Sequence, residues 1–197
     1  RRGELMFETG TSPPGAMAAI LGEMNRSVEE ICLEASERGV VVPANYNAVE
    51  QTVISGEVGG VERAMELAKA AGAKRVVRLN VSGAFHSPLM EPAAAGLAQA
   101  LAAAAWREPA WSVFSNVTAG PVRASADARA LLLQQLTTPV RWVEVIRTMA
   151  AVCPGATFVE MGPGNVLTGL VKRLAPGHVA IPCGTVAEVE SLLKQVS

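Results

Sequence analysis

Histidine is the side chain best suited to acid–base chemistry near neutral pH, and this chain contains only two. His86 follows an apolar run that predicts a strand, and it precedes Pro88, where a helical region is expected to start. Reactive groups in α/β proteins gather at the carboxyl ends of strands. Neutral imidazole has a pKa of about 6.5, so it can take up and return a proton. His86 is therefore a candidate general base; the alternative is a loop histidine with a structural hydrogen bond. His178 has only turn residues beside it and is predicted to lie in a surface loop.

The segment before His86 predicts a small β-α-β-β-α-β unit. Ser27 and Glu30 have the spacing of a capping box, which predicts the start of its first helix, and Gly39 predicts the end of that helix. The sequence Asn-Tyr-Asn-Ala at 45–48 is expected to be a turn. The predicted strands are 16–21, 40–44, 51–55 and 75–81, and the predicted helices are 27–38 and from 59 or 60 to 71. This order is typical of a ferredoxin-like domain.

The segment after His86 alternates helices with strands, which predicts a parallel sheet covered on both faces. Ser125 is a candidate N-cap. The predicted helices are 91–105, 126–136, 141–153, 165–174 and 186–195, and the predicted strands are 111–116, 157–161 and 179–182. Residues 1–8 are predicted to end a helix that Gly10 and a turn through 11–15 close.

Composition excludes several classes of protein. The 197 residues are 50% hydrophobic and 18% charged, which indicates a globular fold. A net charge of −1 argues against a nucleic-acid binder. Three scattered cysteines without a CxxC pair predict neither disulfides nor zinc and fit a cytoplasmic protein. No apolar run has the roughly 18 residues of a membrane helix.

The turn Gly162-Pro163-Gly164-Asn165 lacks the Lys-Ser/Thr of a P-loop and is interpreted as a tight strand-to-helix turn.

The sequence around His86 is one of six motifs, in the same order, that resemble the malonyl-CoA:acyl carrier protein transacylases. The motifs are Arg2-Gly3-Glu4-Leu5-Met6; Asn45-Tyr46-Asn47 with Gln51-Thr52-Val53-Ile54-Ser55-Gly56; Ser82-Gly83-Ala84-Phe85-His86-Ser87-Pro88-Leu89-Met90; Ser115-Asn116-Val117-Thr118-Ala119; Gln134-Gln135-Leu136 through Pro139-Val140-Arg141-Trp142; and Glu160-Met161-Gly162-Pro163-Gly164-Asn165-Val166-Leu167. The resemblance covers about residues 1 to 175. It implies an α/β fold: a hydrolase-like large domain with a parallel sheet, at 1–15 and 82–197, and an inserted ferredoxin-like domain at 16–81.

The resemblance also implies an activity and its residues. A serine would attack the malonyl thioester of malonyl-CoA, and the phosphopantetheine thiol of acyl carrier protein would collect the malonyl group. His86 would be the base, held by the main-chain carbonyl of Gln135 rather than by a carboxylate. Arg2 would bind the malonyl carboxylate with a planar fork of donors, whereas Arg1, which points elsewhere on the helix, would be solvated.

Other matched positions concern selectivity and partners. Phe85 would favour malonyl over methylmalonyl, or is simply a packed core residue. Lys74 and Arg75 would contact coenzyme A phosphates and the acidic carrier protein, although charges at the start of a strand are often only solvated. The remaining pocket-lining matches are Met6, Asn116 and Val166. No cofactor is implied, since malonyl-CoA is a substrate, and a monomer is expected.

The serine elbow Gly-His-Ser-x-Gly and the Gly-Gln-Gly segment of the family are absent from this sequence. Because no initiator methionine precedes the predicted first helix, we expect upstream residues to belong to the same protein. Two alternatives stay open: a non-catalytic module that binds carrier protein or coenzyme A, and an acyltransferase domain of a polyketide synthase. The alternatives predict, respectively, binding without turnover and further fused domains.

Overall fold

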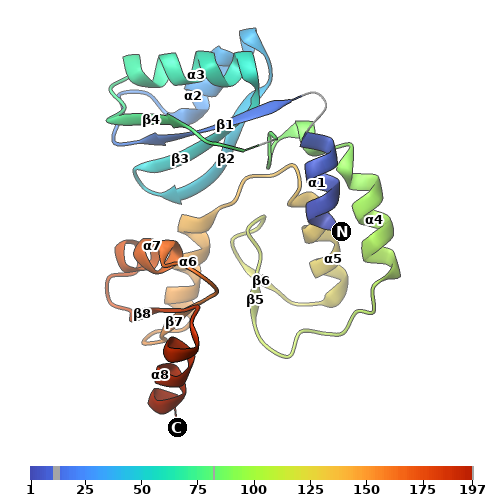
Figure 1. The fold of residues 1–197 in the computed structure, drawn as a ribbon, viewed down its shortest axis with the longest axis vertical. Coiled ribbons are helices and arrows are strands. Elements are labelled where there is room, and N and C mark those ends of the chain that lie inside the picture. Colours follow the sequence, from blue (N-terminus) through green and yellow to red (C-terminus); the bar gives the residue numbers. More distant parts are fainter. Residues whose placement is uncertain (11–13, 82, 197) are drawn as a thin grey trace. The chain divides into compact units, whose positions relative to one another are not determined.

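The computed structural model describes residues 1–10, 14–81 and 83–196. Residues 11–13 of the turn predicted at 11–15 therefore lie outside the described residues, as does Ser82, the first residue of the histidine motif. The chain divides into two compact units, Arg1–Trp142 and Val143–Ser197. Both contain helices and strands, so the structure is a mixed α/β protein (Figure 1).

A four-stranded antiparallel sheet dominates the first half of the first unit. Its elements, in chain order, are β1 (Gly15–Leu21), α2 (Val28–Ala35) with a 3-10 turn at Ser36–Arg38, β2 (Val41–Ala48), β3 (Gln51–Glu57), α3 (Val58–Ala70) and β4 (Arg75–Arg78). The strands lie side by side in the order β2-β3-β1-β4, and all pairs are antiparallel. The predicted β-α-β-β-α-β order and the capping box of Ser27 and Glu30 are confirmed.

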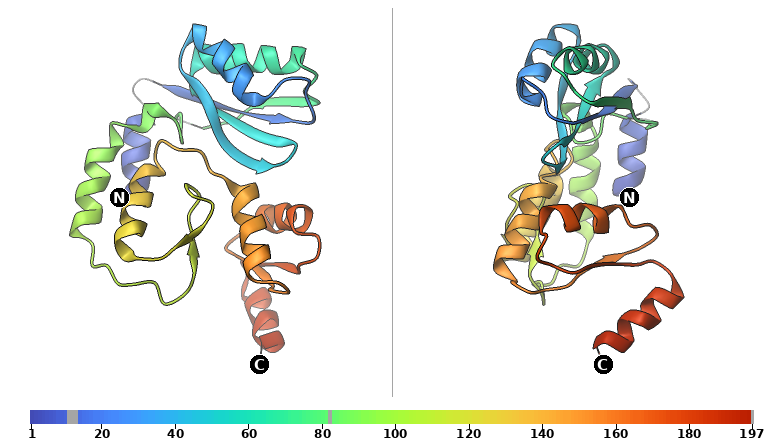
Figure 2. Two further views of the ribbon diagram at one scale, coloured as in Figure 1. Left: turned by 180° about the vertical axis from the view of Figure 1, so that it is seen from behind. Right: turned by 90° about the vertical axis from the view of Figure 1, so that its left-hand side faces the viewer.

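The sheet has an apolar core on each face because successive side chains of a strand point to opposite faces. On one face, Ile20 and Ile54 pack with the buried sides of α2 and α3, which cover that face (Figures 1 and 2). On the other face, Met17, Ala19 and Val53 form a smaller cluster, and Phe85 packs against it. This face of the sheet therefore packs directly against the segment that contains His86.

The turn predicted at 45–48 is wrong, since β2 continues to Ala48. Register shifts interrupt its pairing with β3. A second partner stabilises its outer edge: Tyr46 donates its backbone N–H to Val140 at 2.9 Å, and Val140 donates to Ala44 at 2.8 Å. Asparagine and tyrosine at a turn-like position are thus held extended by a segment almost 100 residues away, which local sequence does not reveal.

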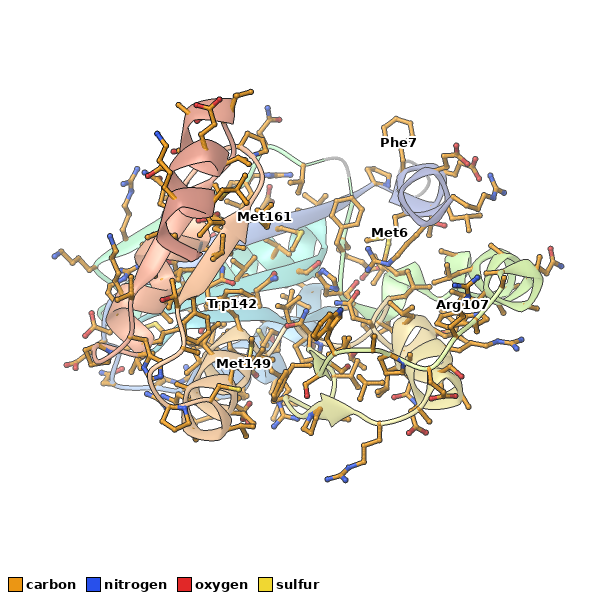
Figure 3. The ribbon with its side chains drawn as sticks, turned by 90° about the horizontal axis from the view of Figure 1, so that it is seen from below. Met6, Phe7, Arg107, Trp142, Met149 and Met161 are labelled. Atoms are coloured by element: carbon orange, nitrogen blue, oxygen red, sulfur yellow. The ribbon has the colours of Figure 1, made fainter. Side chains whose placement is uncertain are left out.

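Three helices form the second core of this unit. They are α1 (Arg2–Gly10), α4 (Ala93–Ala103), which follows a 3-10 turn at Pro88–Met90, and α5 (Ser125–Gln134). α1, α4 and α5 lie next to one another (Figure 2). Leu5 and Met6 pack with Met90, Leu97 and Leu136 between them. Figure 3 shows Met6 and Phe7 leaving α1 on different sides, and Phe7 is exposed.

The connection between α4 and α5 contains only a short antiparallel pair, β5 (Val113–Phe114) with β6 (Pro121–Val122). The predicted strand at 111–116 is therefore longer than the real one. The prediction that Ser125 is an N-cap is wrong, because Ala124 holds that position. The Ser125 hydroxyl instead donates to Glu108 at 2.7 Å. A carboxylate from the preceding loop thus competes successfully for the hydroxyl.

The second unit carries the predicted parallel pairing. β7 (Phe158–Met161) pairs in parallel with β8 (Ala180–Cys183), together with α6 (Trp142–Val152), α7 (Val166–Leu174) and α8 (Val186–Val196). The sequence predicts a parallel sheet for the second half. Within the described residues, that sheet consists of this one pair of strands. Glu160 accepts backbone N–H groups of Leu167 and Thr168 at the start of α7, at 3.0 and 2.7 Å. The Gly-Pro-Gly-Asn sequence at 162–165 is therefore a strand-to-helix turn, and the carboxylate of Glu160 in the preceding strand stabilises it.

Candidate active site

The loop that carries His86 is held by Ser87, which is fully buried. The Ser87 hydroxyl donates to the Ala84 carbonyl at 2.6 Å and accepts the Leu89 N–H at 3.3 Å, so it caps the 3-10 turn that follows. His86 itself has φ of 59°, in the left-handed region that few non-glycine residues occupy. A tight, hydrogen-bonded loop thus imposes an unfavourable backbone conformation on the candidate base.

Two glycines allow this loop to pass close to neighbouring segments. A Cβ on Gly83 would lie 2.8 Å from the Cα of Gly10, at the end of α1. A Cβ on Gly15, at the start of β1, would lie 2.5 Å from the backbone N of Ala84. Because neither approach leaves room for a side chain, the glycines let α1, β1 and the histidine loop meet.

The imidazole of His86 meets the carboxyl end of α5. His86 Nδ1 lies 3.1 Å from the main-chain oxygen of Gln135. The last carbonyls of a helix have no partner within the helix. The Gln134 carbonyl accepts from Thr137 and Thr138, whereas the Gln135 carbonyl faces the imidazole. The Gln135 carbonyl therefore lies within hydrogen-bond distance of the imidazole, and its role in orienting His86 stays a prediction.

Arg2 and Arg1 differ as adjacent residues of a helix should. Arg2 is half-buried and donates from Nη2 to Oε1 of the Gln135 side chain. Arg1 is exposed and lies 3.0 Å from Glu4 and 3.8 Å from Glu8, in surface ion pairs. The structure therefore brings Arg2, His86 and Gln135 together from positions far apart in the sequence, and it leaves Arg1 outside.

Burial lowers the pKa of His86 below its ordinary value of 6.5, and the hydrogen bond with the Gln135 carbonyl partly opposes this shift. The positive charge of Arg2 lowers the pKa of His86 further. Burial also lowers the pKa of Arg2, which nevertheless stays a cation at neutral pH. The site therefore pairs an imidazole that is neutral near pH 7 with a positive charge that can bind an anion.

Phe85 and Met6 line the apolar side of the site. Phe85 packs against the sheet cluster of Met17, Ala19 and Val53, and also against the helical cluster that contains Met6. Met6 is buried. A bulky ring fixed between two cores next to the base limits the space there, which is compatible with both interpretations of Phe85.

A hollow of about 340 Å³ adjoins the polar cluster. Its lining includes Arg2, Gln135 and Asn116 together with several apolar residues such as Leu131. Asn116 Oδ1 is buried and has no hydrogen-bond partner among the described residues. The hollow thus presents donors of Arg2 and an unused acceptor of Asn116 within apolar walls.

Two predicted site residues lie elsewhere in the first unit, and a third belongs to the second unit. Arg75 pairs with Leu21 at one end of β1, while Gly15 at the other end approaches the histidine loop; six residue steps separate them, roughly 20 Å. Lys74 and Arg75 are exposed, and neither forms an ion pair within the described part of the chain. Val166 belongs to the second unit, where it is exposed at the start of α7.

Sequence reasoning missed two features of the site. The buried hydroxyl of Ser87 directly follows His86, and a serine before proline could have indicated a cap. The side chain of Gln135 contacts both Arg2 and His86, whereas only its carbonyl was predicted to matter. His178 is not a plain surface residue either: its ring packs edge-on against Phe158 at 5.6 Å. Among the described residues, no group of three His, Cys, Asp or Glu could hold a metal ion.

A half-buried imidazole held by a main-chain carbonyl beside an arginine, on a mixed α/β fold, defines a class of protein equipped for base-assisted chemistry on an anionic substrate. The profile of one family, described as "Acyl transferase domain", matches residues 1–187. The chain belongs to this acyl transferase family.

Similar proteins narrow this assignment. The chain is 46% identical over 176 residues to a malonyl CoA-acyl carrier protein transacylase of Bacillus subtilis (strain 168), which covers 88% of this chain and 55% of the relative. A crystal structure of a malonyl-CoA:acyl carrier protein transacylase from Xanthomonas oryzae matches with a TM-score of 0.91 and 39% identity, over 98% of this chain and 62% of that one. A structure described as a type II PKS acyl-carrier protein in complex with its malonyl-transacylase contains a chain that matches with a TM-score of 0.91 and 38% identity. The match covers 98% of this chain and 62% of that one. The chain thus spans between half and two thirds of the length of these relatives.

Proposed function

We propose that the protein containing this chain transfers the malonyl group from malonyl-CoA to the phosphopantetheine thiol of acyl carrier protein. The observation that carries the proposal is the meeting of His86, Gln135 and Arg2. An imidazole with a lowered pKa beside a half-buried guanidinium suits a thioester that bears a carboxylate. The names of the similar transacylases support the same substrate and acceptor.

The reaction proceeds through a seryl acyl-enzyme whose serine is expected outside these 197 residues. His86 takes the serine proton as the hydroxyl oxygen attacks the thioester carbonyl, and it returns that proton to the coenzyme A thiolate as the C–S bond breaks. In the second half-reaction His86 takes the proton of the carrier-protein thiol and returns it to the serine. A neutral carbonyl suffices to hold the imidazole because a thiolate is a good leaving group.

Arg2 binds the malonyl carboxylate. A guanidinium offers a planar fork of donors that matches a carboxylate, and the neighbouring hollow has room for the acyl group. Acetyl lacks this carboxylate and would leave the half-buried cation without an anionic partner. Removing one partner of a charged pair of this kind typically costs about 2–5 kcal/mol.

The remaining predicted residues shape the pocket and its approach. Phe85 restricts the space beside the α-carbon and favours malonyl over methylmalonyl, and we assign Met6 and Asn116 to the pocket lining. Val166, in the second unit, is a further pocket-lining candidate on the family match alone. Lys74 and Arg75 are exposed cations without a partner among the described residues, and we assign them to coenzyme A phosphates and to acidic groups of the carrier protein.

The architecture and context that go with this function are also proposals. Residues 16–81 form a ferredoxin-like small domain, supported by the strand order β2-β3-β1-β4. Residues 1–15 and 82–197 belong to a hydrolase-like large domain that further residues would complete. No cofactor is needed, because malonyl-CoA is a substrate. In the part of the chain that the structure describes, no helix is long and apolar enough to cross a membrane. The expected monomeric state and cytoplasmic location stay predictions.

Mass spectrometry of the acceptor tests the proposal. The protein with its serine-containing segment is incubated with malonyl-CoA and a carrier protein that bears phosphopantetheine. We expect the carrier protein to gain the mass of one malonyl group, and methylmalonyl-CoA in competition to be used much less. Binding of the carrier protein without any gain in mass would favour the non-catalytic binding module instead.

A further inference from the structure

Two groups of one residue compete for a single atom of the proposed base. His86 Nδ1 lies 3.1 Å from the Gln135 main-chain oxygen and 2.9 Å from the Nε2 of the Gln135 side chain. A ring nitrogen either carries a proton and donates, or carries a lone pair and accepts. The carbonyl can only accept and the amide nitrogen can only donate. The two contacts therefore require opposite tautomers of the neutral imidazole.

Arg2 determines which contact is made. A guanidinium has donors only, so the atom of the Gln135 amide that faces Arg2 must be the oxygen. The amide NH₂ is then directed at His86 Nδ1. With this arrangement, Nδ1 accepts and the imidazole proton is on Nε2, the nitrogen on the far side of the ring from Gln135. An Nε2 that carries a proton cannot take one from a hydroxyl.

We propose that the Gln135 side chain couples the carboxylate site to the base, so that malonyl binding at Arg2 switches His86 from an inactive to an active tautomer. The inference rests on the proposed function, because it assumes that Arg2 receives the malonyl carboxylate. That carboxylate competes with Gln135 Oε1 for the guanidinium, and a charged acceptor forms the stronger hydrogen bond. The released amide withdraws from Nδ1.

The switch balances as a proton exchange with water. Nε2 gives its proton to water, and Nδ1 gains a proton from water. Nδ1 keeps this proton and uses it to donate a hydrogen bond to the Gln135 carbonyl. The net charge of the ring stays zero, and Nε2 now carries the lone pair that accepts a hydroxyl proton. The hollow beside Arg2 and Gln135 gives the released amide room, and Asn116 Oδ1, an acceptor without a partner among the described residues, lines the same hollow.

This coupling makes Gln135 a positioning residue that contributes to selectivity. Without it, an acyl group that lacks a carboxylate would bind less tightly and react at an ordinary rate once bound. With it, such a group leaves Arg2 with the Gln135 amide and His86 in the wrong tautomer, so the reaction step is slowed as well. Discrimination then falls on kcat in addition to KM.

Nitrogen-15 NMR of the imidazole rings at pH 7.5 tests the coupling in the protein with its serine-containing segment, because the two ring nitrogens of a neutral histidine differ strongly in chemical shift. Comparison with a His86→Asn variant assigns the signals of His86. The probe is monomethyl malonate, which has a carboxylate and a neutral ester; methyl acetate, the same ester without the carboxylate, is the matched control. Side-chain resonances of Arg2 report binding at the guanidinium independently.

We expect the free chain to carry the His86 proton on Nε2, and monomethyl malonate to move it to Nδ1 while methyl acetate does not. A response of Arg2 without any change at His86 would overturn the coupling and leave the proposed function standing. Absence of any Arg2 response up to the solubility limit would contradict the carboxylate site, and with it both proposals.

Gln135→Met gives a second, ligand-free test, since it keeps the main-chain carbonyl and removes the amide. We expect its His86 proton to be on Nδ1 without any probe, and the backbone spectrum to confirm that the variant is folded. Gln134→Met, at the exposed neighbouring position, should behave like the unchanged chain. A Gln135→Met variant with the same tautomer as the unchanged chain would overturn the inference.

Discussion

The sheet region, residues 15–78, and the site cluster of Arg2, His86 and Gln135 are built in different ways. The sheet and its two helices come from one continuous stretch and bury their own core, with Ile20, Ile31 and Ile54 almost completely covered. The site cluster joins three segments that are far apart in the sequence, and its members are half-buried polar groups. Local sequence therefore specifies the sheet region, whereas only the packing of α1, α4 and α5 creates the site.

This difference predicts that substitutions in the sheet core change the stability of the fold with little effect on the reaction. Substitutions at the site should change the reaction with little effect on stability. The histidine loop belongs to both, because Phe85 contacts the sheet core while Ser87 fixes the base. Rates of transfer below refer to the protein with its serine-containing segment.

Ile54→Ala should have the largest effect on stability, since Ile54 is fully buried in β3. Loss of its side chain removes apolar burial and leaves a cavity, which typically costs about 2–5 kcal/mol of the free energy of unfolding. Urea denaturation measures this loss, and the transfer rate of the folded variant should be unchanged. Leu33→Ala, at a residue that is 80% exposed in α2, is the control and should change stability by no more than about 0.5 kcal/mol.

Arg2→Met should mainly affect selectivity. Removing the proposed partner of the malonyl carboxylate should cost about 2–5 kcal/mol in recognition, roughly 30-fold to several thousand-fold in the ratio of kcat/KM for malonyl-CoA over acetyl-CoA. Arg1→Met, which breaks only surface ion pairs, is the matched control. If both variants kept the original preference in a competition assay, the assignment of Arg2 would be wrong.

Ser87→Ala tests whether the histidine loop links the two regions. The change leaves the Leu89 N–H and the Ala84 carbonyl without their buried partner, which typically costs about 1–3 kcal/mol of unfolding free energy. Because the same hydrogen bonds hold the loop, the transfer rate should fall too. An unchanged rate in a destabilised variant would show that Ser87 serves stability alone.

The smallest expected effect is a change in the pKa of His86, which responds to the charge of Arg2. Burial and Arg2 both lower it, so the rate should begin to fall only as the pH drops below 6.5. Arg2→Met removes the repulsive charge, so the pKa of His86 should rise and the acid limb of the rate should move to higher pH. An NMR titration of His86 measures this, and Arg1→Met should leave the pKa where it is.

The two regions also differ in how well the sequence predicts them. The sheet region follows from apolar periodicity and the capping box at Ser27, apart from 45–48, where a distant backbone partner at Val140 keeps the strand extended. At the site, family motifs indicate Arg2, His86 and Gln135. No local pattern indicates that the Gln135 amide would contact both of the others, because that contact depends on where the end of α5 meets α1 and the histidine loop.

The first half-reaction, acylation of the serine by malonyl-CoA, tests the central claim most directly. Rapid quenching followed by intact-protein mass spectrometry gives its rate for the unchanged protein, for His86→Ala and for His178→Ala. We expect His86→Ala to slow acylation by about 10²- to 10⁴-fold, the usual contribution of a general base, and His178→Ala to leave it nearly unchanged. Acylation of the His86→Ala protein at the original rate would contradict the role of His86 and the function built on it.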